Sequence, residues 1–235
     1  RIITMKKFLL AAVVLLGSIS LANAERFSIG VTAKAGAFKA DGASELFTGN
    51  HAGNRATTNI EKTNSEDAEA VMAMGSIFFE VEASDRISLG VNYVPHSMDT
   101  ESTENIQNIG GLPAGPADDD ESRNTVKLSF EDLTTIYAIA DLDNNIYAKL
   151  GYVMVDIITD ENLATGGQYP NTDMDGFVIG VGYSMDLNDG MFARFEASYM
   201  DLDGATVVND NDATKSVKAD GITGVGAGIS IGKSF

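Results

Sequence analysis

The stretch Val225-Gly-Ala-Gly-Ile-Ser-Ile-Gly-Lys-Ser-Phe235 decides the fold. Its large apolar side chains occupy alternate positions, and the positions between them hold only Gly and Ser. Because successive side chains of a β-strand point to opposite faces, this alternation predicts a strand with unlike surroundings on its two sides. The polar face is reduced to the smallest residues, as in a crowded interior, so the bulky apolar face is predicted to meet lipid.

The opposite end of the chain has the pattern of an export leader. A basic start at residues 5 to 7 precedes an apolar run at residues 8 to 16, and a small-residue cleavage site ends at Ala24. We expect residues 1 to 24 to comprise upstream residues and a Sec-type signal peptide, and residues 25 to 235 to form one domain. The alternative, a transmembrane anchor, would need a longer apolar run.

Composition excludes several classes of protein. The chain has 34 acidic and 16 basic residues and a formal net charge of -18 at pH 7. Such a chain repels phosphates, so no nucleic-acid partner is expected. It contains no cysteine, which excludes thiolate chemistry and cysteine-based metal sites.

Alternation predicts eight strands, at residues 27–37, 71–82, 87–94, 125–139, 146–155, 176–184, 191–201 and 221–235. The links between them are alternately long and short, and Asn144-Asn145 and Asp189-Gly190 in short links suit the positive φ values of tight turns. All tight turns then lie at one end and all long loops at the other, as in outer-membrane barrels. The sequence therefore predicts an all-β fold, an eight-stranded antiparallel up-and-down transmembrane β-barrel.

Two aromatic belts are predicted at the ends of the lipid-facing surface. The belt toward the tight turns consists of Phe27, Phe79, Tyr183, Phe195 and Phe235. The belt toward the long loops consists of Tyr93, Tyr152, Phe177 and Tyr199. A soluble β-sandwich or lipocalin-like barrel is the alternative interpretation of the same strands.

The fourth predicted strand does not keep one phase. Its apolar residues change face at Glu131-Asp132, with Val126, Leu128 and Phe130 before that pair and Leu133, Tyr137 and Ile139 after it. A bulge would restore the lipid face, or the first half of the strand would stand clear of the membrane.

The inward positions carry a small set of charges, Lys34, Glu80, Glu82, Lys149, Arg194 and Glu196, with Lys127 and Glu131 as further candidates. An eight-stranded barrel is narrow enough for side chains to fill, so opposite charges at one level are expected to pair across it. This lumen charge network is interpreted as a structural polar plug. The alternative is a narrow or gated conductance path.

The long loops are acidic, with the run Asp118-Asp119-Asp120-Glu121 as the densest stretch. Asp201-x-Asp203 and Asp210-x-Asp212 carry oxygen ligands but lack the full calcium loop, so diffuse divalent cations are expected in place of a formed metal site. The two histidines are His51 and His96. Because adjacent side chains on a strand point apart, His96 and Ser97 are poorly placed as base and nucleophile, and no enzyme or cofactor is expected.

Residues 25 to 235 resemble the small outer-membrane β-barrel family typified by OmpX and the membrane domain of OmpA. The most specific match is residues 229 to 235, which look like the carboxy-terminal signal of that family, with Ile229, Ile231 and Phe235 as its assembly signal. Residues 146 to 152 and 192 to 197 also resemble strands of the family. Lys233 departs from it, since an apolar residue is usual there.

The resemblance implies a Gram-negative outer-membrane protein. Its implied partners are outer-membrane lipid and lipopolysaccharide, together with the barrel assembly machinery during insertion. We expect a non-enzymatic integral barrel whose external acidic loops serve envelope integrity or surface interaction. The alternative is a narrow porin-like channel for small polar or cationic solutes drawn by the acidic mouth.

Overall fold

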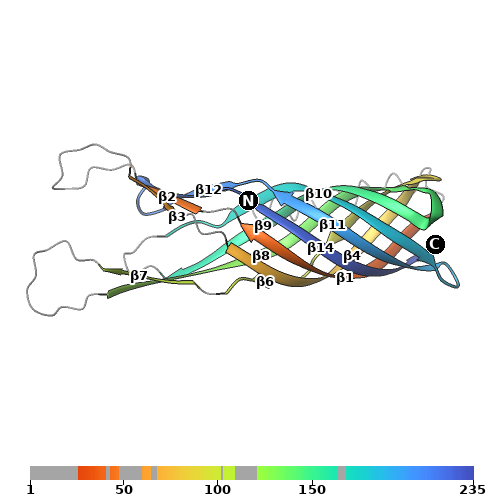
Figure 1. Ribbon diagram of the computed structural model, residues 1–235, viewed down its shortest axis with the longest axis horizontal. Helices are drawn as coiled ribbons and strands as arrows, with labels where there is room; N and C mark the ends of the chain where they lie inside the picture. The colour runs from red at the N-terminus through yellow and green to blue at the C-terminus, as the bar shows by residue number, and fades with distance from the viewer. Residues whose placement is uncertain are drawn as a thin grey trace, which may run out of the picture.

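The computed structural model describes residues 26–40, 43–47, 60–64, 68–101, 103–108, 121–162 and 168–235, so the expected signal peptide, His51 and the run at 118–120 lie outside the described residues. Eight long strands form its body: β1 (Phe27–Ala40), β4 (Ala68–Ser84), β5 (Ile87–Tyr93), β8 (Glu121–Asp141), β9 (Ile146–Asn162), β10 (Thr172–Asp186), β11 (Met191–Leu202) and β14 (Ile222–Ser234). Each pairs antiparallel with its neighbours, and the β5–β8 pairing closes the ring (Figure 1). The predicted eight-stranded antiparallel barrel is confirmed.

The tight turns lie together at one end of the barrel, called here the turn end, and the long links lie at the other, the loop end (Figure 1). One turn is the short 3-10 helix η1 (Asp143–Asn145). Asn144, Asn145, Asp189 and Gly190 have φ values of 63°, 64°, 58° and 76°. The predicted left-handed turn residues are confirmed, because Asn, Asp and Gly tolerate this conformation.

A bulge lies in β8, where the sequence pattern changes phase. Glu131 pairs with Asp156 and Thr134 with Met154, so two residues of β8 face a single residue of β9. Asp132 takes a positive φ of 52°, and the Thr134 hydroxyl donates to the Asp132 carbonyl at 2.9 Å. The extra residue shifts the inward–outward alternation of the second half of β8 by one position. Of the two alternatives that the sequence left open, the structure therefore has the bulge.

The outward face of the barrel is apolar and exposed. Leu150 is 61% exposed, Val31 57%, Val181 55% and Ile229 51%. A water-soluble barrel would bury such side chains, whereas a closed transmembrane barrel presents them to hydrocarbon. The interpretation as a soluble sandwich or lipocalin-like barrel is therefore wrong.

Among the described residues, no helix is both long and apolar enough to cross a membrane.

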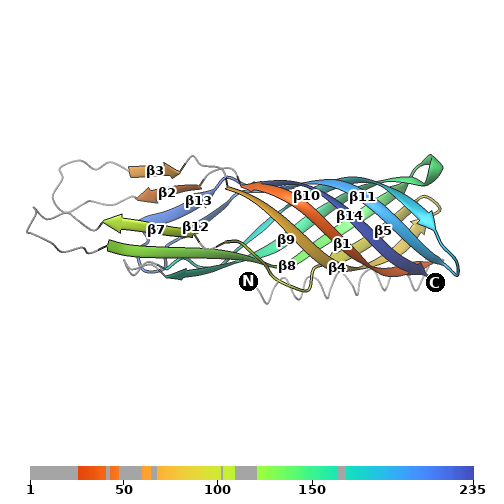
Figure 2. The same cartoon turned by 60° about the horizontal axis from the view of Figure 1, so that its bottom comes forward.

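Strands also occupy the long links, where the sequence pattern predicted none. β2 (Ala43–Phe47), β3 (Ile60–Asn64), β12 (Ala205–Val208) and β13 (Lys215–Ala219) form a second sheet in the order β12-β13-β2-β3, and β6 (Met98–Asp99) and β7 (Thr103–Asn108) pair with β8. Of these strands, β2, β3, β7, β12 and β13 project beyond the loop end of the barrel (Figures 1 and 2). Their sequences lack apolar alternation, because pairing between hairpins, and not a buried face, holds them.

Candidate functional site: a filled lumen

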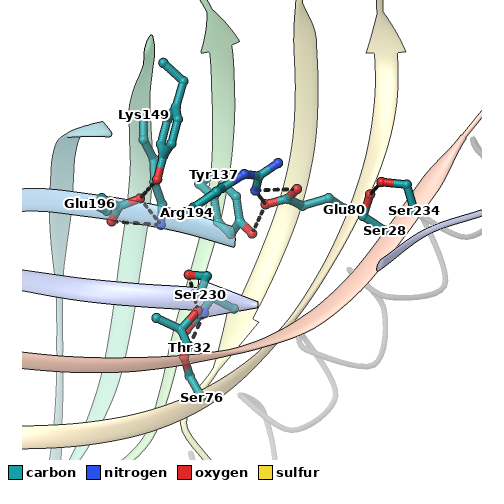
Figure 3. Close-up of polar contacts among 12 residues, drawn as sticks. Ser28, Thr32, Ser76, Glu80, Tyr137, Lys149, Arg194, Glu196, Ser230 and Ser234 are labelled. Carbon is teal, nitrogen blue, oxygen red and sulfur yellow. Dashed lines mark hydrogen bonds and ion pairs between the residues drawn. The ribbon is translucent and has the colours of Figure 1, made fainter. Parts of the chain in front are cut away.

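One ion pair crosses the lumen from β11 to β4. The Arg194 Nη1 atom donates to both carboxylate oxygens of Glu80, at 2.7 and 2.8 Å. The Tyr137 hydroxyl of β8 donates to Glu80 Oε1 at 2.8 Å. β1 and β14 separate the strands of Glu80 and Arg194, so the pair spans the interior (Figure 3). The Glu80 side chain is 4% exposed, which makes this a desolvated, charge-assisted contact.

A second pair lies beside the first. Lys149 Nζ is 3.2 Å from Glu196 Oε2 (Figure 3). The Tyr147 hydroxyl donates to the same oxygen at 3.2 Å. The Lys149 ammonium also lies 4.3 Å from the centroid of the Tyr137 ring. Through Tyr137 the two ion pairs form one network at the centre of the barrel.

Aromatic rings fill the space that glycines leave on the barrel wall. A Cβ atom on Gly182 would overlap the Tyr147 ring, and one on Gly90 would overlap Tyr137. Nearer the turn end, Phe78 and Phe192 lie over Gly30 and Gly232. The Phe78 and Phe192 ring centroids are 6.2 Å apart. Glycine is needed at these positions because each large ring lies directly over the backbone of the paired residue on the neighbouring strand, where a Cβ atom would collide with the ring.

Hydroxyl pairs line the wall between β1 and β14. The Ser28 and Ser234 hydroxyls are 2.9 Å apart, and those of Thr32 and Ser230 are 2.8 Å apart (Figure 3). These small polar residues satisfy one another across neighbouring strands. They leave the centre of the lumen to the charged and aromatic side chains.

The structure does not join every predicted charge to this network. Glu82 lies opposite Ser88 near the turn end, and no ion pair or hydrogen bond links its side chain to another described residue. Lys34 lies in the same cross-strand row as Glu196, with Gly228 between them, and forms no ion pair with a described residue. Lys127 pairs instead with Asp99 at 2.7 Å, near the loop end.

A buried apolar core lies inside the barrel toward the loop end, and we call it the apolar cap. Its buried members are Met74, Val94, Met98, Leu133, Val153, Val155, Ile157, Met174, Val178, Met200 and Leu202. Val153 and Val155 are fully buried. The cap begins where the loop-side aromatic belt lies, since Val153 follows Tyr152 and Val178 follows Phe177 in sequence.

The apolar cap was not predicted from the sequence, where the inward positions were expected to be polar. The missed pattern is the run at residues 152 to 155, which is apolar in both phases, as in a strand buried on both faces. Beyond the membrane, water surrounds the barrel, so burying apolar side chains inside it becomes favourable. The interior therefore changes from polar to apolar along its length.

The predicted belt aromatics lie on the outward face. In the belt near the turn end, the Phe27 ring stacks on Phe235 at 5.1 Å and on Phe79 at 6.1 Å. Near the loop end, the Tyr93 hydroxyl donates to Asp132 at 2.6 Å and the Tyr152 hydroxyl donates to Asp175. Tyr199 is also hydrogen-bonded to a carboxylate, that of Asp201. Each of these tyrosines has an apolar ring and a hydroxyl on a polar group, as at a lipid–water interface.

The remaining belt members and the predicted assembly signal are also exposed on this face. Tyr183 is 45%, Phe195 48% and Phe177 43% exposed. Ile231 is 48% and Phe235 57% exposed. The Phe235 amide donates to the Phe27 carbonyl at 2.9 Å, which joins the last strand to the first.

The described loop acids form local contacts and no cluster arranged for a metal ion. Asp212 accepts hydrogen bonds from the hydroxyl and amide of Thr214, and these bonds lower its pKa. A hydrogen bond from Lys127 likewise lowers the pKa of Asp99. His96 accepts the Gly75 amide on Nε2, so its described contacts are with backbone and not with a nucleophile.

These features define the class of the protein. A closed eight-stranded antiparallel barrel with an exposed apolar wall, aromatic rings at both edges and a filled polar lumen is an outer-membrane β-barrel, and its place is the bacterial outer membrane.

The chain is similar to several solved structures. Outer membrane protein OprG from Pseudomonas aeruginosa is 13% identical, with a TM-score of 0.40, covering 90% of this chain and 96% of OprG. Outer membrane protease OmpT from Escherichia coli is 8% identical, with a TM-score of 0.43 and coverages of 91% and 98%. Ail, the attachment invasion locus protein of Yersinia pestis, is 8% identical, with a TM-score of 0.34 and coverages of 88% and 99%.

No protein-family model matches the chain, and no curated protein matches its sequence. At these identities and TM-scores, nothing about binding or activity passes from the solved structures to this chain.

Proposed function

We propose that this chain is a non-enzymatic barrel of the OmpX and OmpA-domain type, with a structural plug as its lumen and an external acidic surface that serves envelope integrity or surface interaction. The observation that carries the proposal is that two different sets of side chains occupy the lumen at different depths. The network of Glu80, Arg194, Lys149 and Glu196 crosses it, and the apolar cap closes it toward the loop end.

The network favours a plug over a conducting path. An ion that passed Glu80 or Arg194 would have to separate a buried pair, and removing one partner of such a pair costs about 3–5 kcal/mol. The side chains of Arg194 and Glu80 are 15% and 4% exposed, so little water replaces the lost contact. The apolar cap then adds a segment of the lumen whose side chains cannot solvate an ion.

With a plugged lumen, the loop end is left to interact with the surroundings. Short turns are periplasmic and long loops external in barrels of this type, which places β2, β3, β7, β12 and β13 outside the cell. Described acids there include Asp99, Glu101, Asp160, Asp203 and Asp210. They favour diffuse divalent cations, and the belt tyrosines with their carboxylate partners suit the headgroup zone of lipopolysaccharide.

Export and insertion complete the proposal. Residues 1 to 24 would be removed as a signal peptide, and the barrel assembly machinery would read Ile229, Ile231 and Phe235. These three side chains are exposed on one face of β14, where a receptor can reach them.

Single-channel recording in planar bilayers tests the plug. We expect no regular openings from the wild-type barrel, nor from Lys34→Ala, which removes a lumen charge outside both ion pairs. Arg194→Ala and Glu80→Ala are expected to introduce fluctuating leak, because each removes half of the crossing contact. Regular wild-type openings that Arg194→Ala abolishes would overturn the proposal and favour the narrow channel.

Lipid hydrolysis tests the non-enzymatic assignment. Purified wild-type barrel and His96→Ala are expected to release fatty acid from outer-membrane lipid at the same background rate. Activity lost only in His96→Ala would reassign the chain as a lipid-modifying enzyme.

A further inference from the structure

The barrel wall has a seam at the loop end. β4 extends to Ala68, but β5 pairs with it only as far as the Ile77–Tyr93 pair. From Ala68 to Ser76, β4 is paired with β1 on one side, while no described strand pairs with its other side. The seam is thus the boundary between β4 and the chain that follows Tyr93.

The chain after Tyr93 follows β8 instead of β4. The Val94 amide donates to the Leu133 carbonyl at 3.0 Å, and the Thr100 amide donates to the Leu128 carbonyl at 2.9 Å. Pro95 has no amide to donate, so the segment leaves the β4 ladder at this point. One side of the seam is therefore β4, and the other is the residue 94–100 segment, which is hydrogen-bonded to β8.

One side chain bridges the seam. The Gly75 amide donates to His96 Nε2 at 3.0 Å. Gly75 and Ile77 are two residues apart on one strand, so their backbone groups point to the same side. At Ile77 the partner is the strand residue Tyr93, and at Gly75 the imidazole takes the place of a strand carbonyl.

The two contacts of His96 require one protonation state. Nδ1 lies 3.1 Å from the Ser97 carbonyl, which can only accept, so Nδ1 carries the proton. Nε2 accepts the Gly75 amide and must be unprotonated. A second proton would set an N–H of the ring against the N–H of Gly75 and remove the contact.

We propose that His96 is a proton-sensitive latch that holds the seam closed when neutral and releases β4 when charged. Histidine is the side chain whose charge ordinarily changes between pH 5 and 8, which sets the pH range of the test. The geometry that carries the proposal is the hydrogen bond from the Gly75 amide to the imidazole, at the level where the β4–β5 ladder ends.

Charged groups lie on the elements that neighbour His96. Asp99 lies in β6 and Glu101 follows it, β8 carries Lys127, Glu131 and Asp132, and β4 carries Glu69 farther toward its start. Asp99 is paired with Lys127, and Asp132 accepts the Tyr93 hydroxyl.

Release of the latch would uncover the apolar cap. Met74 on β4 and Met98 on β6 belong to the cap and lie on opposite sides of the seam, 8% and 7% exposed. Separating β4 from the residue 94–100 segment would admit water to both thioethers. The cap therefore supplies a second readout, independent of backbone exchange.

Amide exchange in lipid nanodiscs, measured by NMR at pH 8 and pH 5, tests the latch. After correction for intrinsic pH dependence, we expect Gly75 to exchange about fivefold faster at pH 5 relative to Ile77, the value for loss of one hydrogen bond. Met74 and Met98 methyl signals should become more sensitive to a water-soluble paramagnetic agent at pH 5.

The control variant is His96→Gln, whose amide oxygen accepts the Gly75 amide and does not titrate. It is expected to protect Gly75 equally at both pH values, whereas His96→Ala is unprotected at both. Equal wild-type protection of Gly75 at pH 8 and pH 5, or a His96→Gln variant that keeps the pH dependence, would overturn the proposal. The test does not involve conductance, so it stands apart from the plug.

Discussion

Removing Arg194 should destabilise the barrel more than any surface charge. Arg194→Ala leaves the Glu80 carboxylate with a 4% exposed side chain and only the Tyr137 hydroxyl at 2.8 Å as its partner. An unpaired buried charge of this kind costs about 3–5 kcal/mol of unfolding free energy. The double variant Arg194→Ala/Glu80→Ala removes both charges and leaves one unsatisfied hydroxyl, which costs about 1–3 kcal/mol. The double variant should therefore be about 2 kcal/mol more stable than the single one.

Urea titration in lipid vesicles measures this difference. Because the chain has no tryptophan, circular dichroism of the strands and the gel mobility of folded barrel serve as readouts. Lys218→Ala is the matched control, since its pair with Asp220 at 2.8 Å has side chains 59% and 56% exposed and contributes about 0–1 kcal/mol. If Arg194→Ala were no more damaging than Lys218→Ala, or the double variant were less stable than Arg194→Ala, the pair would not be a buried plug.

Three further substitutions test other parts of the structure. Gly182→Ala should cost about 1–3 kcal/mol by the same titration, because its methyl group overlaps the Tyr147 ring; an unchanged midpoint would contradict a filled lumen. Leu150→Arg places a charge on the lipid face and should cost about 2–4 kcal/mol in vesicles; little loss would place Leu150 outside the hydrocarbon. Asp212 has a lowered pKa, so its contribution to local order is present above its unfolded pKa and is lost as pH falls through the folded value. Thr214→Val removes the hydroxyl that donates to Asp212 and should raise this pKa in an NMR titration. An unchanged pKa would exclude the Thr214 hydroxyl as the cause of the shift.

Local pattern was sufficient for the barrel body. Alternation at residues 225 to 235 predicts which side chains are exposed, and Asn144, Asn145 and Asp189 predict the left-handed turns, because both effects operate within a few residues. The same alternation also predicted which charged side chains point into the barrel. Their partners were not, since Arg194 and Glu80 are 114 residues apart and meet only when strand register is fixed.

Tertiary structure decided the rest. The strands β2, β3, β12 and β13 exist because two hairpins pair with each other. Their sequences have no apolar alternation from which these strands could be predicted. The apolar cap depends on where water replaces lipid around the wall, which is a property of the closed barrel and not of one strand. The sequence by itself determined that these strands have a lipid face and a small-residue face, because period two is a local property. The three-dimensional closure alone decided which charges meet, where the lumen becomes dry and where the wall is left unpaired beside His96.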